Sequence, residues 1–313
     1  MDVKLQQRGG PGRAGAPQPA EESPPGSATP TGPRDGEGTG PAPLPDRPAS
    51  RPADWARSVP DPVLGVVGIL LLAGALEALP RLGVVSPDYL PPFSDMASAL
   101  ADEAGRGSFW QALLDTAKGW AYGLAIAVAA GVVLGLLIGS VGFLRRATAS
   151  TIEFLRPIPS VALVPLAVLV YGTGLQSKLL LVVYASFWPV LLQVLHGVQD
   201  VDPVARDTAA SYRFTVWTRL RHLVWPTTLP YLMTGVRLSA SVALILSISA
   251  ELLIGSPGLG SRIALAQAGN AIATMYALVI VTGALGVLVN VLARALERRV
   301  LSWHTSVRTE AVT

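Results

Sequence analysis

Long apolar runs with almost no charge begin near residue 61, and they constrain the fold of this chain more than any other feature. A transmembrane helix needs about 20 consecutive apolar residues, because the hydrocarbon core of a bilayer is roughly 30 Å thick. Inside lipid each backbone hydrogen bond must be made within the segment, and a helix achieves this. The runs are Val63–Leu79, Gly119–Leu144, Ile158–Tyr171, Leu179–Leu195, Leu229–Ile254 and Tyr276–Leu292. The sequence therefore predicts an all-α membrane protein with about six transmembrane helices.

The third run is shorter than a complete span. Pro159 and Pro165 interrupt Ile158–Tyr171, and a proline removes a helical hydrogen bond. We expect this span to take its first turns from Ala147–Leu155.

Composition supports a lipid environment and excludes several kinds of chemistry. Hydrophobic residues make up 50% of the 313 residues and charged residues 14%, whereas soluble domains carry about a quarter. The chain has no cysteine and only the scattered histidines His196, His222 and His304, so neither a thiol nucleophile nor a zinc cluster is expected. The net charge of +3 does not indicate nucleic-acid binding. Since the G-x-x-x-x-G-K-[ST] phosphate loop is missing, we predict no ATP site and no catalytic site in this chain.

The first 60 residues follow different physics. They contain 13 prolines, 9 glycines, and seven basic and seven acidic residues that cancel. Such a segment cannot bury enough apolar surface to offset its ordering entropy. We expect a disordered cytoplasmic tail over 1–60, a membrane domain over 61–304 and a short C-terminal cytoplasmic tail over 305–313. A docking segment is the alternative for the first tail; a signal peptide is not expected, because no apolar core appears before residue 63.

Arginine and lysine gather at one side of the predicted membrane domain. Cytoplasmic loops carry an excess of these residues in membrane proteins. With the first tail inside, the inner side holds twelve: Arg145, Arg146, Arg156, Arg206, Arg213, Arg219, Arg221, Arg237, Arg294, Arg298, Arg299 and Arg308. The outer side holds five: Arg81, Arg106, Lys118, Lys178 and Arg262. This bias predicts that both termini and a loop at about 198–228 face the cytosol.

Small residues recur at every fourth position of the second span, from Gly119 to Gly139. This spacing lets two helix backbones approach closely where no hydrophobic effect drives helices together. A four-residue step drifts about 40° around the helix, so we expect the ladder to cross several neighbours. Packing within the chain is favoured over a seam between two copies.

Three acidic residues lie near the ends of spans, and such residues are functional candidates in membranes. They are Glu77, Glu153 and Glu251, and Glu153 has Arg156 one turn later as a possible partner. Glu251 precedes the glycine-rich stretch Gly255–Gly260 on the outer side. A satisfied polar group at a helix end is favoured for Glu251 over a place on the translocation pathway.

The loop at 198–228 contains a well-marked helix start. Asp202 supplies a capping oxygen, and Pro203 suits the first helical position, so we expect a helix to Tyr212. A second helix follows, and the residues of its apolar side are Trp217, Leu220, Leu223 and Val224. Such a pair suits docking into a groove on a partner and, equally, lying flat on lipid.

This loop resembles the EAA loop of binding-protein-dependent ABC import permeases. Asp207-Thr208-Ala209 stands for Glu-Ala-Ala, Arg213 for the glycine that follows, and Leu223–Pro226 for the Ile-x-Leu-Pro ending. Only Ala209 and Pro226 match outright. A non-glycine residue in a left-handed turn costs about 1 kcal/mol, so either the turn is built differently here or Arg213 makes a compensating contact.

Flanking segments extend the resemblance to residues 62–304. They are similar to the permeases of nitrate, sulfonate, taurine and bicarbonate importers, and they comprise Phe154–Pro165, Tyr171–Gly174, Leu229–Arg237 and Ala250–Gly260. The resemblance implies the core of a type I ABC importer permease in the bacterial inner membrane. It also implies two permease copies, separate ATPase subunits that bind ATP, and an extracytoplasmic binding protein that meets the outer loops at 83–108 and 255–262. Asp207 would pair with an ATPase arginine.

The solute is left open by the sequence. The resemblance favours a small anion such as a sulfonate, taurine or nitrate, with a vitamin precursor such as a thiamine pyrimidine as the alternative. An ion-coupled secondary transporter would need an acidic residue deep in a span and inverted repeats. A membrane anchor for a soluble complex would need no pathway.

Overall fold

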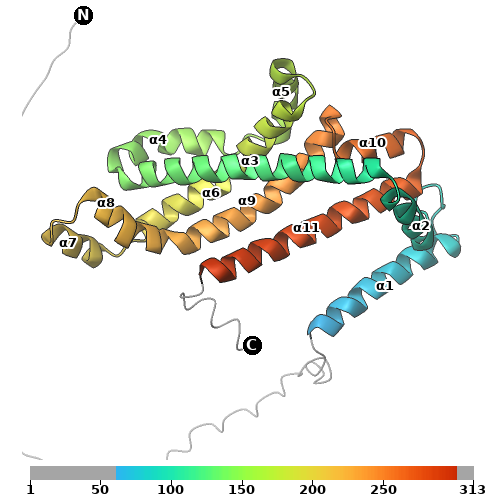
Figure 1. Ribbon diagram of the computed structural model, residues 1–313, viewed down its shortest axis with the longest axis horizontal. Coiled ribbons are helices and arrows are strands. Elements are labelled where there is room, and N and C mark those ends of the chain that lie inside the picture. Colours follow the sequence, from blue (N-terminus) through green and yellow to red (C-terminus); the bar gives the residue numbers. More distant parts are fainter. Residues whose placement is uncertain (1–60, 302–313) are drawn as a thin grey trace, which may run out of the picture. The chain divides into compact units, whose positions relative to one another are not determined.

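The computed structural model describes residues 61–301, and every regular element in that range is a helix. The predictions for the tails at 1–60 and 305–313 lie outside the described residues. In chain order the elements (Figure 1) are α1 Asp61–Arg81, α2 Phe93–Ala104, α3 Gly107–Ser140, α4 Gly142–Leu155, the 3-10 helix η2 Ser160–Leu163, α5 Val164–Tyr171, α6 Leu175–Gln199, α7 Pro203–Ser211, α8 Val216–Arg219, the π-helix η3 Leu220–Val224, α9 Trp225–Ile254, α10 Leu259–Ala268 and α11 Ile272–Val300.

The prediction of about six spans is confirmed. Five segments are long and apolar enough to cross a bilayer: α1, α3, α6, α9 with the short helices before it, and α11. The sixth is a broken span in which α4 and the segment Ser160–Tyr171 meet at 83°. As predicted, the first turns of this span come from the segment that contains Ala147–Leu155, which is part of α4. The two halves of the span, however, are not collinear.

Two side chains of α6 donate hydrogen bonds to carbonyl groups of the broken span. Tyr184 donates its hydroxyl to the carbonyl of Leu155, at 2.6 Å, where α4 ends. Ser177 donates to the carbonyls of Ala167 and Gly172. Irregular backbone at membrane depth is tolerated where it is buried in protein or lines a water-filled cavity. Through these hydrogen bonds, Tyr184 and Ser177 of α6 stabilise the backbone on either side of the break.

The second span is longer than its apolar run. It begins at Gly107 rather than Gly119, because Phe109 and Ala112 bury apolar surface against Leu259 and Leu278. Lys118 lies directly before the uncharged run, and its exposed side chain lies 3.4 Å from Asp115. A charged residue with access to solvent does not end a helix.

The small-residue ladder of α3 packs along one neighbour, α6. A β-carbon added at any of five glycines would collide with an α6 side chain, and the pairs are Gly119 with Lys178, Gly123 with Val182, Gly131 with Val190, Gly135 with Val194 and Gly139 with Val198. The residue numbers of the paired positions increase together along the two helices, so α3 and α6 run parallel. Packing within the chain is confirmed, whereas the expected crossing over several neighbours is wrong, because α6 follows the winding ladder.

Helix α9 covers another side of α6 at equally short range. A β-carbon at Gly235 would lie 3.2 Å from the α-carbon of Val190, and one at Gly197 would lie 2.8 Å from that of Thr228. Ser239 also donates a 2.6 Å hydrogen bond to the carbonyl of Ser186. The three helices α3, α6 and α9 thus form the core.

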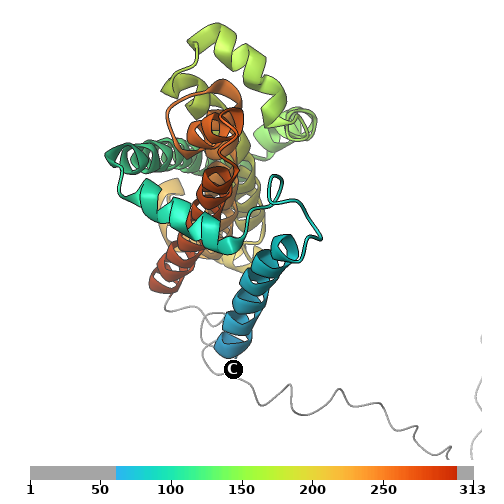
Figure 2. The same cartoon turned by 90° about the vertical axis from the view of Figure 1, so that its right-hand side faces the viewer.

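The remaining helices close one end of this core. Helices α2 and α10 lie at the end of α3 opposite α7 and α8 (Figure 1). Glu103 of α2 is buried and forms ion pairs with Arg262 of α10 and with Arg106. Most side chains of α1 are exposed, and α1 is joined to the bundle through α2 (Figure 2). Glu77 of α1 accepts a 2.9 Å hydrogen bond from the Ser94 amide at the start of α2.

We predict that Gly131→Ala lowers the thermal unfolding midpoint of the detergent-purified protein. The added methyl group would lie 2.8 Å from the β-carbon of Val190 and 3.2 Å from the amide nitrogen of Leu191, which cannot move independently. Overpacking of this kind costs about 1–3 kcal/mol.

Gly283→Ala is the matched control, because Gly283 is also helical and nothing lies within 4 Å of its added β-carbon. That variant should be neutral or slightly stabilised, since alanine favours a helix by roughly 1 kcal/mol over glycine. Equal midpoints for the two variants would show that the α3–α6 seam is loose.

Candidate coupling loop and buried ion pair

The helix predicted in the loop at 198–228 is present and capped as expected. Asp202 accepts a 2.7 Å hydrogen bond from the amide of Val204, and Pro203 is the first residue of α7. The helix ends at Ser211, one residue before the predicted end. A capped helix of this length is a stiff element on a loop.

Arg213 occupies a left-handed turn. Its φ is 54°, its amide donates to the carbonyl of Ala210 at 2.9 Å, and the amide of Phe214 donates to that of Ala209 at 2.9 Å. The turn is therefore of the left-handed kind for which glycine is suited, and the hypothesis of a differently built turn is wrong. Within residues 61–301 the Arg213 side chain is exposed and makes no hydrogen bond or ion pair.

The motif residues divide into buried and exposed groups. Ala209 is buried, and the Thr208 hydroxyl donates a 2.8 Å hydrogen bond to the carbonyl of Val204. Asp207 is exposed, as is Pro226 at the start of α9. Arg206 ties α7 to the core through a 2.5 Å hydrogen bond to the carbonyl of Val198 at the end of α6. The loop therefore anchors one side of α7 and presents Asp207 on another.

Large apolar side chains of this loop are exposed. Val216 is 84% exposed and Trp217 68%, and Tyr212 and Val204 are exposed as well. Trp217 was predicted to share one apolar side with Leu220, Leu223 and Val224; the other three are half-buried, whereas Trp217 faces away. An exposed apolar surface of this kind suits a protein partner or lipid.

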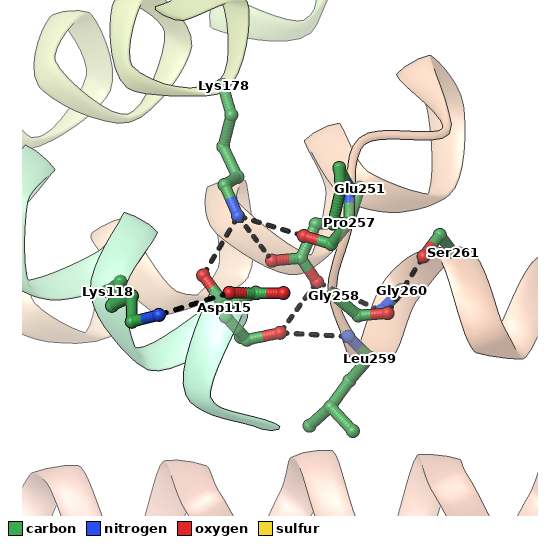
Figure 3. Close-up of polar contacts among 10 residues, drawn as sticks. Asp115, Lys118, Lys178, Glu251, Pro257, Gly258, Leu259, Gly260 and Ser261 are labelled. Atoms are coloured by element: carbon green, nitrogen blue, oxygen red, sulfur yellow. Dashed lines mark hydrogen bonds and ion pairs between the residues drawn. The ribbon is translucent and has the colours of Figure 1, made fainter. Parts of the chain in front are cut away.

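Glu251 is enclosed at the other end of the bundle, where it meets Lys178 (Figure 3). The exposed fractions are 0% for the Glu251 side chain and 1% for that of Lys178, and their charged atoms lie 2.9 Å apart. The second carboxylate oxygen accepts hydrogen bonds from the Thr116 hydroxyl at 2.8 Å and the Gly260 amide at 3.0 Å. A buried carboxylate is stable when it is paired and hydrogen-bonded in this way.

Lys178 is also fully satisfied. Besides Glu251, its ammonium donates to the carbonyl oxygens of Asp115 at 3.1 Å and Pro257 at 3.3 Å (Figure 3). This corrects the prediction that Lys178 is an outer-loop cation. This pair could not be predicted from the sequence, because a lysine just before an apolar run is typical of a side chain that reaches for water.

Two glycines let the backbone wrap around Glu251. A β-carbon at Gly258, whose φ is 156°, would overlap the Glu251 carboxylate, and one at Gly260 would lie 2.7 Å from the Glu251 β-carbon. The amide of Leu259 donates a 2.9 Å hydrogen bond to the Thr116 hydroxyl. Glu251 is thus a satisfied polar group, as favoured, although it is buried rather than near water. A role on the translocation pathway would require residues 255–260 to move.

We predict that Lys178→Met and Glu251→Gln each lower the yield of monodisperse protein and its unfolding midpoint. Removing one partner leaves a buried charge uncompensated, at a cost of about 3–5 kcal/mol. The double variant should unfold at a higher temperature than either single variant, because neither charge is then left alone.

Lys118→Met is the control on the same side of the bundle. The Lys118–Asp115 pair is 58% and 39% exposed, so its loss should cost under about 1 kcal/mol. A double variant that is less stable than both single variants would argue against the uncompensated charge as the cause.

Residues 61–301 contain no group of three His, Asp or Glu side chains placed to hold a metal ion. These residues form packed helices, an exposed capped helix α7, and a buried ion pair enclosed by residues 255–260.

Comparison with known proteins identifies relatives over most of the chain. Residues 131–302 match the family described as the binding-protein-dependent transport system inner membrane component. The taurine transport system permease protein TauC of Escherichia coli is 31% identical over 78% of this chain and 90% of its own length. The putative aliphatic sulfonates transport permease protein SsuC of Bacillus subtilis is 27% identical, over 76% and 88%. The bicarbonate transport system permease protein CmpB of Synechococcus elongatus is 26% identical, over 77% and 88%.

The segments that carry the sequence resemblance from the broken span onward lie inside the matched region, and so does the loop at 198–228 with its capped helix α7. This chain belongs to the family of inner membrane components of binding-protein-dependent transport systems.

Proposed function

We propose that this chain is the permease subunit of an ATP-driven importer for a small anionic solute of the sulfonate, taurine or bicarbonate type. The observation that carries this proposal is the exposed, capped helix α7 in a chain of this family. The named relatives transport taurine, aliphatic sulfonates and bicarbonate, whose common feature is a small anionic oxygen group. A vitamin precursor such as a thiamine pyrimidine is the alternative solute.

Energy would come from separate ATPase subunits, because this sequence lacks a phosphate loop of its own. Helix α7 would enter a groove on an ATPase, with Asp207 paired to an arginine there. The hydrogen bond from Arg206 to the carbonyl of Val198 would pass the movement of α7 to α6. Two copies of this chain would surround one pathway, and an extracytoplasmic binding protein would deliver the solute to the outer loops.

The proposed orientation places α7 in the cytosol and both termini on the same side. The removal of Lys178 from the outer cations strengthens the arginine bias that supports it. The chain would then be a multi-pass protein of the bacterial inner membrane with α2 and α10 facing outward.

A cysteine-labelling experiment tests this orientation. The chain has no cysteine, so single cysteines placed at Ser98 and Ala210, both exposed, report without background. In intact cells an impermeant thiol reagent should label Ser98→Cys and not Ala210→Cys, and both should react after lysis. Labelling of Ala210→Cys from outside would reverse the orientation and remove the coupling role of α7.

Coupling through Asp207 is tested by ATPase copurification and by ATP-driven taurine uptake in proteoliposomes. Asp207→Ala should leave the permease folded and weaken ATPase association, by about 3–5 kcal/mol if the pair is well buried. Asp207→Lys should be worse, since it brings two positive charges together. Asp102→Ala, which changes an exposed aspartate of α2, is the control for copurification alone and should bind the ATPase as the wild type does.

Arg213→Gly separates backbone from side chain in the same assay. Glycine relieves the left-handed φ of 54°, so folding should improve by about 1 kcal/mol. A loss of uptake in this variant would place the guanidinium at the ATPase surface. Normal uptake by Asp207→Lys would contradict the coupling role, and uptake without any ATPase would favour a secondary transporter.

A further inference from the structure

One face of α11 changes from apolar to basic along its length. Its residues are spaced three or four apart, as the positions of one helix face are, and they are exposed or half-buried: Val279, Gly283, Val287, Asn290, Arg294 and Arg298. Val287 is 65% exposed, and nothing lies within 4 Å of a β-carbon added at Gly283. We refer to this face as the α11 stripe.

The basic end of the α11 stripe lies at the edge of the bilayer. No charged residue occurs from Ile272, where α11 begins, to Ala293. At a rise of 1.5 Å per residue this uncharged part is roughly 33 Å long, which matches a hydrocarbon core of roughly 30 Å. Arg294 is therefore at the level of the lipid phosphates, and Asn290, one turn earlier, is at the level of the glycerol esters.

Arg237 of α9 joins this end of the stripe. Helices α9 and α11 run beside each other in opposite directions (Figure 1), because a β-carbon at Gly286 would contact Leu244 and, further along α11, Glu297 meets Arg237. Glu297 is one turn after Arg294 on α11, a spacing that places two β-carbons about 5–6 Å apart. Arg237 and Arg294 are thus neighbours of the same carboxylate.

The polar groups at this end of the stripe have spare hydrogen-bonding capacity. The Arg237–Glu297 separation is 3.8 Å, which is too long for a hydrogen bond, and 44% of the Arg237 side chain is exposed. Within residues 61–301 the side chains of Arg237, Arg294 and Asn290 make no hydrogen bond. A guanidinium group has five N–H donors, and at membrane depth it needs acceptors to satisfy them.

The charge around Glu297 is positive, because Arg237, Arg294 and Arg298 outnumber this one carboxylate. In the described part of the chain, no second carboxylate forms an ion pair at this end of the bundle, and the pair predicted for Glu153 and Arg156 on α4 is not formed. The surface therefore suits a ligand with a net negative charge.

We propose that the α11 stripe and Arg237 bind an anionic phospholipid of the phosphatidylglycerol type in the cytosolic leaflet. Arg237 and Arg294 donate to the phosphodiester oxygens, which suit the fork of a guanidinium group. Asn290 donates its amide to an ester carbonyl, and an acyl chain lies along Val287 and Gly283. Basic pockets between transmembrane helices hold acidic head groups in this way. Assignment to the cytosolic leaflet rests on the proposed function; the lipid contact does not.

Two other occupants fit this surface less well. A zwitterionic lipid has the same phosphate, but its ammonium group would be repelled by the net positive charge. An ATPase that docks on α7 would contact a different level of the molecule. Arg219 of α8 lies roughly 27 Å before Arg237 along the continuous helical segment Val216–Ile254.

The experiment is native mass spectrometry of the detergent-purified full-length permease, without ATPase or ATP. The probes are phosphatidylglycerol and phosphatidylcholine with the same acyl chains, each titrated separately. We expect the wild type to bind phosphatidylglycerol more tightly. Arg237→Gln and Arg294→Gln should each weaken phosphatidylglycerol binding by about tenfold or more, since each removes a charged hydrogen-bond donor. Their effect on phosphatidylcholine should be smaller.

Two further variants separate the parts of the site. Asn290→Leu should weaken both lipids alike, by about threefold, because the ester carbonyls are common to both and the lost hydrogen bond is neutral. Glu297→Gln should tighten phosphatidylglycerol binding, because Arg237 is then no longer shared with a carboxylate. Weaker binding by Glu297→Gln would contradict the proposed geometry.

Arg219→Gln is the matched control, because it removes the same charge from an exposed site away from the stripe. It should bind both lipids as the wild type does. Equal weakening by Arg219→Gln and Arg294→Gln, or unchanged binding in both Arg237→Gln and Arg294→Gln, would overturn the proposal. Size-exclusion profiles and unfolding midpoints of all variants show whether the protein is folded.

The remaining outcomes identify a different occupant. Glycerol 3-phosphate lacks acyl chains and should not displace phosphatidylglycerol; displacement at equal concentration would make the ligand a soluble phosphate. Loss of a dimer by Arg294→Gln with unchanged lipid binding would assign the stripe to a second copy of this chain. The proposed function fails separately, through loss of ATP-driven uptake by the wild type, and lipid binding in detergent does not depend on uptake.

Discussion

Close contact between α3 and α6 is the constraint on which the rest of this structure depends. Lipid offers no hydrophobic drive for two helices to associate, so their attraction comes from van der Waals contact at short range. Glycines on α3 let valines of α6 approach over the whole shared length. Helix α6 is therefore fixed at both ends: Lys178 at one end meets Glu251, and Val198 at the other receives the Arg206 side chain. The Lys178–Glu251 ion pair and the loop that carries α7 are therefore attached to opposite ends of the same helix.

Features governed by neighbouring residues were predictable from the sequence. The apolar runs gave the spans, and Asp202 with Pro203 gave the start of α7, because both depend on local chemistry. The ion pair of Lys178 and Glu251 was not predictable, since its members lie 73 residues apart and each looks like a side chain near water. The bend of 83° in the third span was likewise hidden, because prolines indicate an interruption but not its direction.

The two ends of the bundle differ in how their charges are used. At the end with α2 and α10, the acidic residues Glu103 and Glu251 are buried, and each is paired with a basic residue. At the end with α7, the charged side chains of Asp207 and Arg213 are exposed. Paired buried charges hold one conformation, whereas exposed unpaired charges are available for binding. The end with α2 and α10 is thus held together by buried ion pairs, whereas the end with α7 presents exposed charges.

The wrapping of residues 255–260 around Glu251 has a consequence for how this sequence can change. The carboxylate occupies the volume that a side chain at Gly258 would need, and the Glu251 β-carbon restricts Gly260 in the same way. Thr116 joins them by bonding both the carboxylate and the amide of Leu259. A substitution at any one of these positions is therefore tolerated only in the presence of changes at the others. Residues 255–260 should evolve with Glu251 and Thr116 as a single epistatic unit, with Lys178 on a separate helix as its distant member.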